Sequence, residues 1–266
     1  MDQATIEGCK AKVDRAEELL EIGADQWRAY LKTNPWPSRI DDRTDPPWHR
    51  IYIDFTAPPP PRFAVLIGEI AHDLRSALDH LAWREAVECV GLQDAERNAS
   101  VITFPLAKSP AAFKGAQALQ YIGKDARTIM ERYQPYESGK EKRPLSLGLL
   151  HWFNRMDKHR TIQVTAVGAP SIITMKALKI TFTHGARIEA VDPRLTPGQR
   201  LIGETEIVRI RFVAGGPDPK VEVHGTPPIT PAFGHPPHPL RGMTITQTIT
   251  QVREVIADFA NLLPER

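Results

Sequence analysis

Residues able to transfer protons or to hold a phosphate group gather in two short segments of the sequence. One is RSALDH, at residues 75–80, and the other is NRMDKHR, at residues 154–160. Histidine has a pKa close to neutrality and therefore suits general acid or base chemistry. Arginine offers a planar fork of N–H donors that matches phosphate oxygens. These residue types predict chemistry at a phosphate, provided that the two segments meet in the fold.

Both segments are expected to lie on helices. The first belongs to the most strongly patterned helix of the chain, expected over residues 62–90 with Gly91 marking its end. One side of this helix is apolar, and the other side carries Glu69, His72, Asp73, Ser76, Asp79, His80 and Arg84. The second segment closes an amphipathic helix expected over 145–156.

The rest of the pattern changes from helical to β-rich near residue 161. Further helices are expected over residues 3–33, 111–121, 124–133 and 243–262, and a short strand is expected over 49–55, before four consecutive prolines. Alternating and β-branched residues predict about five strands, over 162–167, 172–182, 186–190, 201–213 and 220–223. The stretch 226–238, rich in proline and histidine, is expected to be a solvated loop.

These elements predict an α+β protein of 266 residues, a length that is comfortable for two cores. We expect an N-terminal helical bundle over residues 1–160 and a β-rich region, antiparallel, over 161–240. The C-terminal helix, within 241–266, is expected to dock on one of these two parts.

The order arginine, polar residue, three residues, histidine at 75–80 resembles the signature of the HEPN superfamily. This is a group of helical-bundle proteins, many of which are RNases that cleave RNA without a metal ion. The resemblance implies that Arg75 binds phosphate, that Ser76 is the polar residue beside it and that His80 is the general acid or base. Asp79 is included in the same candidate catalytic site. The resemblance also implies a homodimer acting on single-stranded RNA without a cofactor, in a toxin or phage-defence role.

Substrate binding is expected from the second segment and from one further histidine of the first helix. Basic residues near Arg75 and His80 are suited to hold phosphates, and Asp157 is suited to orient a histidine. The candidate substrate-binding residues are His72, Asn154, Asp157, Lys158, His159 and Arg160.

Two alternatives need no catalysis. Arg75 and Asp79 have the i,i+4 spacing of an ordinary helix ion pair, with His80 covering a helix junction. The cations of residues 154–160 also suit the last turn of a helix, where the dipole favours positive charge. The looser HEPN pattern additionally matches residues 43–49, in a proline-rich stretch. If both segments only stabilise their helices, the chain is a non-catalytic binding module that recognises a protein partner through its β-rich region.

A metal site is a further alternative. Glu69 and His72 have the Glu-x-x-His spacing of di-iron bundles, but this spacing does not occur a second time. Because His151 and His159 repeat the eight-residue spacing of His72 and His80, a mononuclear site built from histidines and Asp79 stays open. Neither a P-loop nor a Gly-x-Ser-x-Gly elbow is present.

Composition sets the remaining limits. The chain is 41% hydrophobic and 25% charged with a formal net charge of +2, so nucleic-acid binding would need a local basic patch. No apolar run approaches the roughly 18–20 residues that span a bilayer, and the first residues lack the apolar region of a secretory signal. Cys9 and Cys89 have no paired spacing, which favours a reducing compartment. We therefore expect a cytoplasmic protein without membrane contact.

Overall fold

The computed structural model divides the chain into two compact units. It describes residues 1–41, 48–137, 146–159, 164–168, 179–182, 187–194, 203–213, 221–224, 229–233 and 242–262. The first unit, called here the helical unit, comprises residues 1–24, 64–162 and 242–266. The second, called the sheet unit, comprises residues 25–63 and 163–241.

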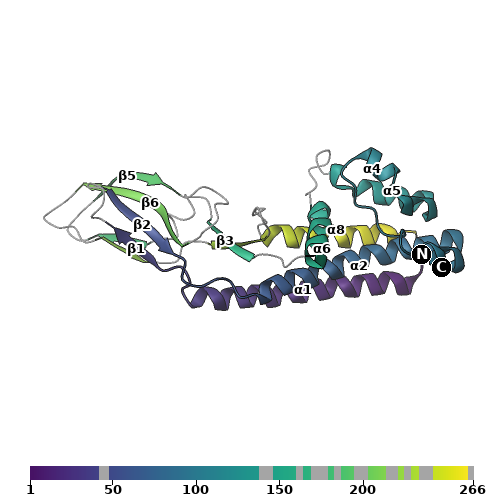
Figure 1. Ribbon diagram of the computed structural model, residues 1–266, viewed down its shortest axis with the longest axis horizontal. Coiled ribbons are helices and arrows are strands. Elements are labelled where there is room, and N and C mark those ends of the chain that lie inside the picture. The colour runs from purple at the N-terminus through teal and green to yellow at the C-terminus, as the bar shows by residue number, and fades with distance from the viewer. Residues whose placement is uncertain are drawn as a thin grey trace. The chain divides into compact units, whose positions relative to one another are not determined.

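Long helices dominate the helical unit (Figure 1). They are α1 (Gln3–Lys32, whose last residues belong to the sheet unit), α2 (Arg62–Val90), α6 (Ser146–His159) and α8 (Gly242–Ala260). Shorter elements follow α2, namely α3 (Leu92–Arg97), α4 (Pro110–Lys114), η1 (Gln117–Tyr121), α5 (Lys124–Arg132) and η2 (Pro135–Glu137). The helix expected over 111–121 is thus two short helices, with Gly115 ending the first. None of the described helices is both long enough and apolar enough to span a membrane.

Helix α2 is the central element of the helical unit. Its predicted bounds are confirmed, and Gly91, which follows it, has φ of 81°, a left-handed conformation that glycine adopts without strain. Leu74, Leu78 and Leu81 are each at most 1% exposed. On one side the Cys9 thiol of α1 donates to the Ala77 carbonyl of α2, and on another side α6 and α8 pack against it. Only a narrow stripe of α2 therefore stays open to solvent.

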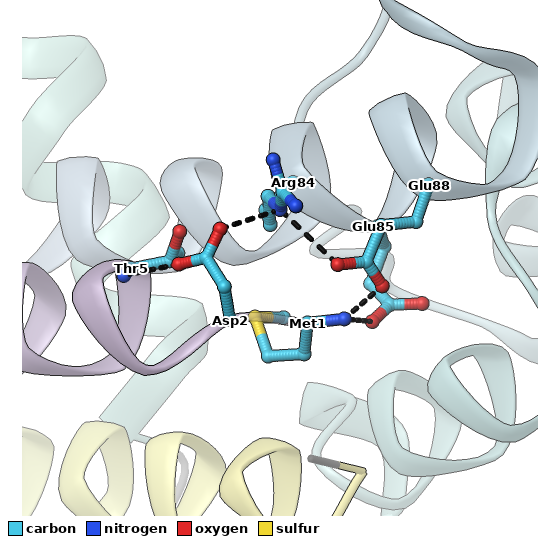
Figure 2. A network of polar contacts seen from close by, with 6 residues as sticks. All are labelled: Met1, Asp2, Thr5, Arg84, Glu85 and Glu88. Atoms are coloured by element: carbon cyan, nitrogen blue, oxygen red, sulfur yellow. Dashed lines mark hydrogen bonds and ion pairs between the residues drawn. The ribbon is translucent and has the colours of Figure 1, made fainter. Parts of the chain in front are cut away.

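The N-terminal end of α1 is joined to the C-terminal half of α2 by a polar network (Figure 2). Asp2 accepts a hydrogen bond from the Thr5 amide at 2.7 Å, which caps the first turn of α1. Arg84 of α2 contacts Asp2 at 2.8 Å and Glu88 at 3.1 Å. Glu88 also pairs with the amino group of Met1. Helix capping and the α1–α2 contact therefore share the same carboxylate, Asp2.

The sheet unit is built on a four-stranded antiparallel sheet of order β1-β2-β6-β5 (Figure 1). Its strands are β1 (Ser38–Asp41), β2 (Trp48–Asp54), β5 (Arg187–Pro193) and β6 (Glu204–Val213). One face packs on an aromatic core whose buried members are Tyr30, Trp36, Ile51, Ile53, Phe63, Ile207, Val208 and Ile210. The end of α1 thus completes the hydrophobic core of this sheet.

The strand count and strand sources differ from the expectation. The main sheet has four strands rather than about five, and two of them, β1 and β2, come from before residue 161. The predicted strands at 162–167, 172–182 and 220–223 instead correspond to separate antiparallel pairs, β3 (Val164–Gly168) with β8 (Ile229–Phe233) and β4 (Lys179–Phe182) with β7 (Val221–His224). Strand β8 lies in the stretch expected to be a loop. A proline such as Pro231 is tolerated there because, among the described residues, β8 pairs with β3 alone.

The division into units also runs differently from the expected boundaries. Residues 25–63, which we expected to be part of the helical region, belong to the sheet unit because β2 pairs with β6 over seven positions. The C-terminal helix α8 belongs to the helical unit, where Arg253 contacts Asp14 of α1 at 2.7 Å.

The two cysteines occupy different environments, and this difference is testable. Cys9 is fully buried, and burial raises the pKa of its thiol to about 11, whereas Cys89 is exposed. Because the thiolate is the reactive form, we expect iodoacetamide at pH 8 to alkylate Cys9 at least about 100-fold more slowly than Cys89 in the folded protein. Peptide mass spectrometry after timed labelling measures both rates, and urea should abolish the difference. Comparable rates in the folded protein would contradict the burial of Cys9.

Candidate functional site

Arg75 and Asp79 of α2 form a closed ion pair that also holds the backbone of Phe104. The Arg75 guanidinium donates to the Asp79 carboxylate at 2.9 and 2.7 Å, and its Nη2 also donates to the Phe104 carbonyl at 2.8 Å. The Phe104 amide in turn donates to Asp79 at 2.8 Å. The Arg75 side chain is 11% exposed. The interpretation of these two residues as an i,i+4 helix pair is therefore confirmed, with an added tertiary contact.

His80 lies on the exposed stripe of α2, next to α1. Its Nε2 is 3.5 Å from the Ser76 hydroxyl oxygen. Partial burial of the ring lowers the pKa of His80, and the nearby Lys12 ammonium of α1 lowers it further against the opposing effect of Asp79. Lys12 also lies 3.9 Å from the Asp73 carboxylate. His80, Ser76 and Lys12 thus form an open cluster in which partial burial and the Lys12 charge lower the pKa of the histidine.

The structure separates Arg75 from His80 within one chain. Five residues along an α-helix turn the side chain by about 140° around the axis. The Arg75 guanidinium faces Phe104, whereas the His80 ring lies near Lys12 of α1. The expected arginine–histidine pair is therefore not formed by a single copy of the chain.

The second candidate segment lies on α6, which packs against α2. The residue of α6 influenced by the charge of Arg75 is His151, upstream of the residues that were predicted. Partial burial lowers the pKa of His151 in α6. The positive charges of Arg75, Arg155 and Lys108 lower it further. Asn154 is half-buried on the same helix, while the side chains of Asp157, Lys158 and His159, and the whole of Arg160, lie outside the described residues. Lys108, distant in sequence and in no motif, carried no signal that would have predicted it.

The segment that carries Lys108 is held at both ends. At one end, Phe104 is bound by Arg75 and Asp79. At the other, the buried Gln134 side chain donates to the Pro105 carbonyl at 2.7 Å and accepts from the Ala107 amide at 2.7 Å. These bonds fix the backbone of residues 104–107 between α2 and the end of α5.

Histidine and carboxylate side chains of the described residues do not converge as metal ligands would. Glu69, His72 and Asp73 line an open groove of about 380 Å³ between α1 and α2, together with Arg15. Two cations, Arg15 and Lys12, share that region with the two carboxylates. The alternative of a site built on His72, Asp79 and His80 is therefore wrong for this part of the chain, and the side chain of His159 lies outside it.

Two arginines of the main sheet are paired with carboxylates of other strands. Arg39 pairs with Glu204 and lies 4.5 Å from the Tyr52 ring. Arg211 pairs with Glu189 at 2.7 Å. These pairs bring positive and negative groups together along the sheet, an arrangement that stabilises neighbouring strands. Arg39 and Arg211 are thus each charge-compensated by a carboxylate of another strand.

No family model matches the sequence, and no curated protein or solved structure shows significant similarity to it. The resemblance to the HEPN superfamily therefore depends on the residues of 75–80 and on their place in a helical unit.

Proposed function

We propose that the helical unit is a HEPN-like, metal-independent endoribonuclease for single-stranded RNA, in which His80 is the catalytic base. The observation that supports this proposal best is the open cluster of His80, Ser76 and Lys12. It presents a neutral imidazole, a hydroxyl group and a cation on one exposed surface. Arg75 acts as a positioning residue, because its guanidinium is bound to Asp79 and Phe104.

The chemistry follows from these groups. Neutral His80 accepts the proton of a ribose 2′-hydroxyl while the 2′-oxygen attacks the adjacent phosphorus. The bond from phosphorus to the 5′-oxygen breaks, the 5′-oxygen takes a proton from an acid, and a 2′,3′-cyclic phosphate remains. Lys12 stabilises the negative charge on the phosphate oxygens during this step.

The general acid is expected from a second copy of the chain. His72 shares the exposed stripe with His80, but eight residues separate them by about 12 Å along the helix. One phosphate cannot contact both histidines at that distance. A homodimer that pairs the two exposed stripes brings His80 of each copy towards the same substrate.

The test is cleavage of a single-stranded RNA in EDTA, comparing wild type with His80→Ala and, as a control outside the candidate site, Lys114→Ala at an exposed lysine of α4. Loss of the base is expected to lower the rate by about 10²–10⁴-fold, whereas Lys114→Ala is expected to retain most of the activity. Because one His80 must be neutral as the base and its counterpart protonated as the acid, the rate should follow a bell-shaped pH profile. Its maximum should lie below pH 7, since the pKa of His80 is lowered. Absence of cleavage by wild type, or equal rates for wild type and His80→Ala, contradicts the proposal.

A second candidate function is that of a degenerate relative that binds without cleaving. It is favoured by the closure of Arg75 on Asp79, which withdraws the arginine of the HEPN signature from substrate. RNA that binds in a filter or anisotropy assay but stays intact in EDTA would support this candidate over the first. We expect the protein to act in the cytoplasm, because its two cysteines are free thiols and its proposed substrate is RNA.

A further inference from the structure

We propose that the helical unit holds a second, separate site, for a phosphate oxyanion, between α6 and the segment 104–108. Its groups are Lys108, His151 and Arg155, with Arg75 behind them. This site lies on the Arg75 side of α2, away from the cluster around His80. It does not depend on the proposed ribonuclease activity.

Arg75 provides the first indication, because one of its donors has no partner. Its Nε and Nη2 atoms are bound to Asp79 and Phe104, but Nη1 is buried without a hydrogen-bond acceptor among the described residues. A buried guanidinium N–H left without an acceptor is costly, more so than a neutral donor. Within the described part of the chain, the carboxylate of Asp79 therefore leaves the Nη1 donor of the Arg75 guanidinium without a hydrogen bond.

The backbone brings α6 beside the part of α2 that carries Arg75. Leu74 of α2 and Leu150 of α6 line the same apolar contact, and Arg75 and His151 are the next residues on these two helices. Arg155 follows His151 by one helical turn and is exposed on the same helix. The charges of Arg75 and Arg155 both lower the pKa of the His151 ring, in agreement with this placement.

Lys108 completes the site from a rigid segment. Gln134 and the Arg75–Asp79 pair fix residues 104–107, so the backbone leading to Lys108 is ordered before any ligand arrives. Lys108 is exposed, and its charge also acts on His151. Preordered donors bind with a smaller loss of conformational entropy than mobile ones.

The ligand chemistry follows from the charges. Among the described residues, the charged groups that lower the pKa of His151 are three cations, one each from α2, the segment 104–108 and α6 itself. Such a cluster repels itself and is relieved by an anion that accepts several hydrogen bonds. A phosphate group, with its tetrahedral oxygens, fits a lysine point charge combined with arginine donors. Free phosphate and the phosphodiester of a nucleic acid share this chemistry.

Isothermal titration at constant ionic strength tests the site with two probes, inorganic phosphate and a short single-stranded oligonucleotide. Lys108→Ala and Arg155→Ala are each expected to weaken binding by about tenfold, since each removes a charge-assisted contact. Lys114→Ala is the matched control, an exposed lysine at the end of α4 whose loss should change nothing. Equal thermal midpoints for the variants show that folding is intact.

The outcomes are distinct. Binding of inorganic phosphate that is weakened by Lys108→Ala identifies a free-phosphate site, and binding of the oligonucleotide alone with the same sensitivity identifies a nucleic-acid contact. Binding should also tighten as the pH falls, because an anion favours the protonated His151 ring. His80→Ala should leave phosphate binding unchanged, which separates this site from the proposed catalytic one. No binding of either probe, or equal effects of Lys108→Ala and Lys114→Ala, overturns the inference.

Discussion

Replacing Asp79 with alanine is expected to lower the free energy of unfolding by about 2–4 kcal/mol, close to the cost of breaking other buried ion pairs. The change removes the acceptor of two Arg75 bonds and of the Phe104 amide at once. It leaves the Arg75 guanidinium, whose side chain is 11% exposed, without its countercharge. Because the Asp79 side chain is 30% exposed, water compensates part of the loss, and the expected cost lies below that of a fully buried pair.

Urea denaturation followed by circular dichroism measures this cost. The matched control is Asp94→Ala, which breaks the exposed Arg97–Asp94 pair of α3 and should produce little change. A double variant, Arg75→Met with Asp79→Leu, removes both charges and should recover much of the stability lost in Asp79→Ala. If Asp79→Ala unfolds at the same urea concentration as Asp94→Ala, the ion pair is not the structural clamp that we describe.

Trp36→Ala is expected to cost about 3–5 kcal/mol, as large-to-small changes of buried aromatic residues do. Trp36 is 1% exposed and lies 5.2 Å from Tyr30 and 6.1 Å from Phe55, measured between ring centroids. The turn around it is tied to the end of β2, because the Asp54 amide donates to the Pro37 carbonyl at 3.0 Å. Loss of the indole therefore opens a cavity where the end of α1 meets the sheet.

Hydrogen exchange with mass spectrometry locates the effect of this change. Since Trp36 belongs to the sheet unit, we expect faster exchange in β1, β2 and β6 and unchanged protection in the middle of α2. Trp152→Ala, at a half-buried tryptophan of α6, serves as the control and should leave the sheet unaffected. Uniform loss of protection across both units would contradict an effect confined to the sheet unit.

The helices were the part of the fold that could be predicted best. The bounds of α2 followed from a one-sided apolar pattern and from Gly91, both of which act within a few residues. Strand β8 was missed because its pattern is interrupted by Pro231, and the partner that stabilises it, β3, lies about sixty residues earlier. Strand β1 is four residues long and depends on its pairing with β2, which no local pattern reveals.

The contacts of the candidate site could likewise be predicted only where they join residues close in sequence. The Arg75–Asp79 pair could be predicted, since i,i+4 neighbours on a helix meet whatever surrounds them. The sequence also placed Ser76 and His80 together on the polar side of α2. Lys108 and His151 were not predicted as partners of Arg75, because their approach depends on how α6 and the segment 104–108 pack against α2.

The sequence by itself thus determined the long helices, the two polar segments and the pairing of Arg75 with Asp79, because hydrophobic periodicity and one-turn contacts depend on neighbouring residues. Only the tertiary structure decided that Arg75 faces Phe104 while His80 faces Lys12. It also decided that residues 25–63 join the sheet. These arrangements depend on which surfaces bury one another, and that choice is made between segments far apart in the chain.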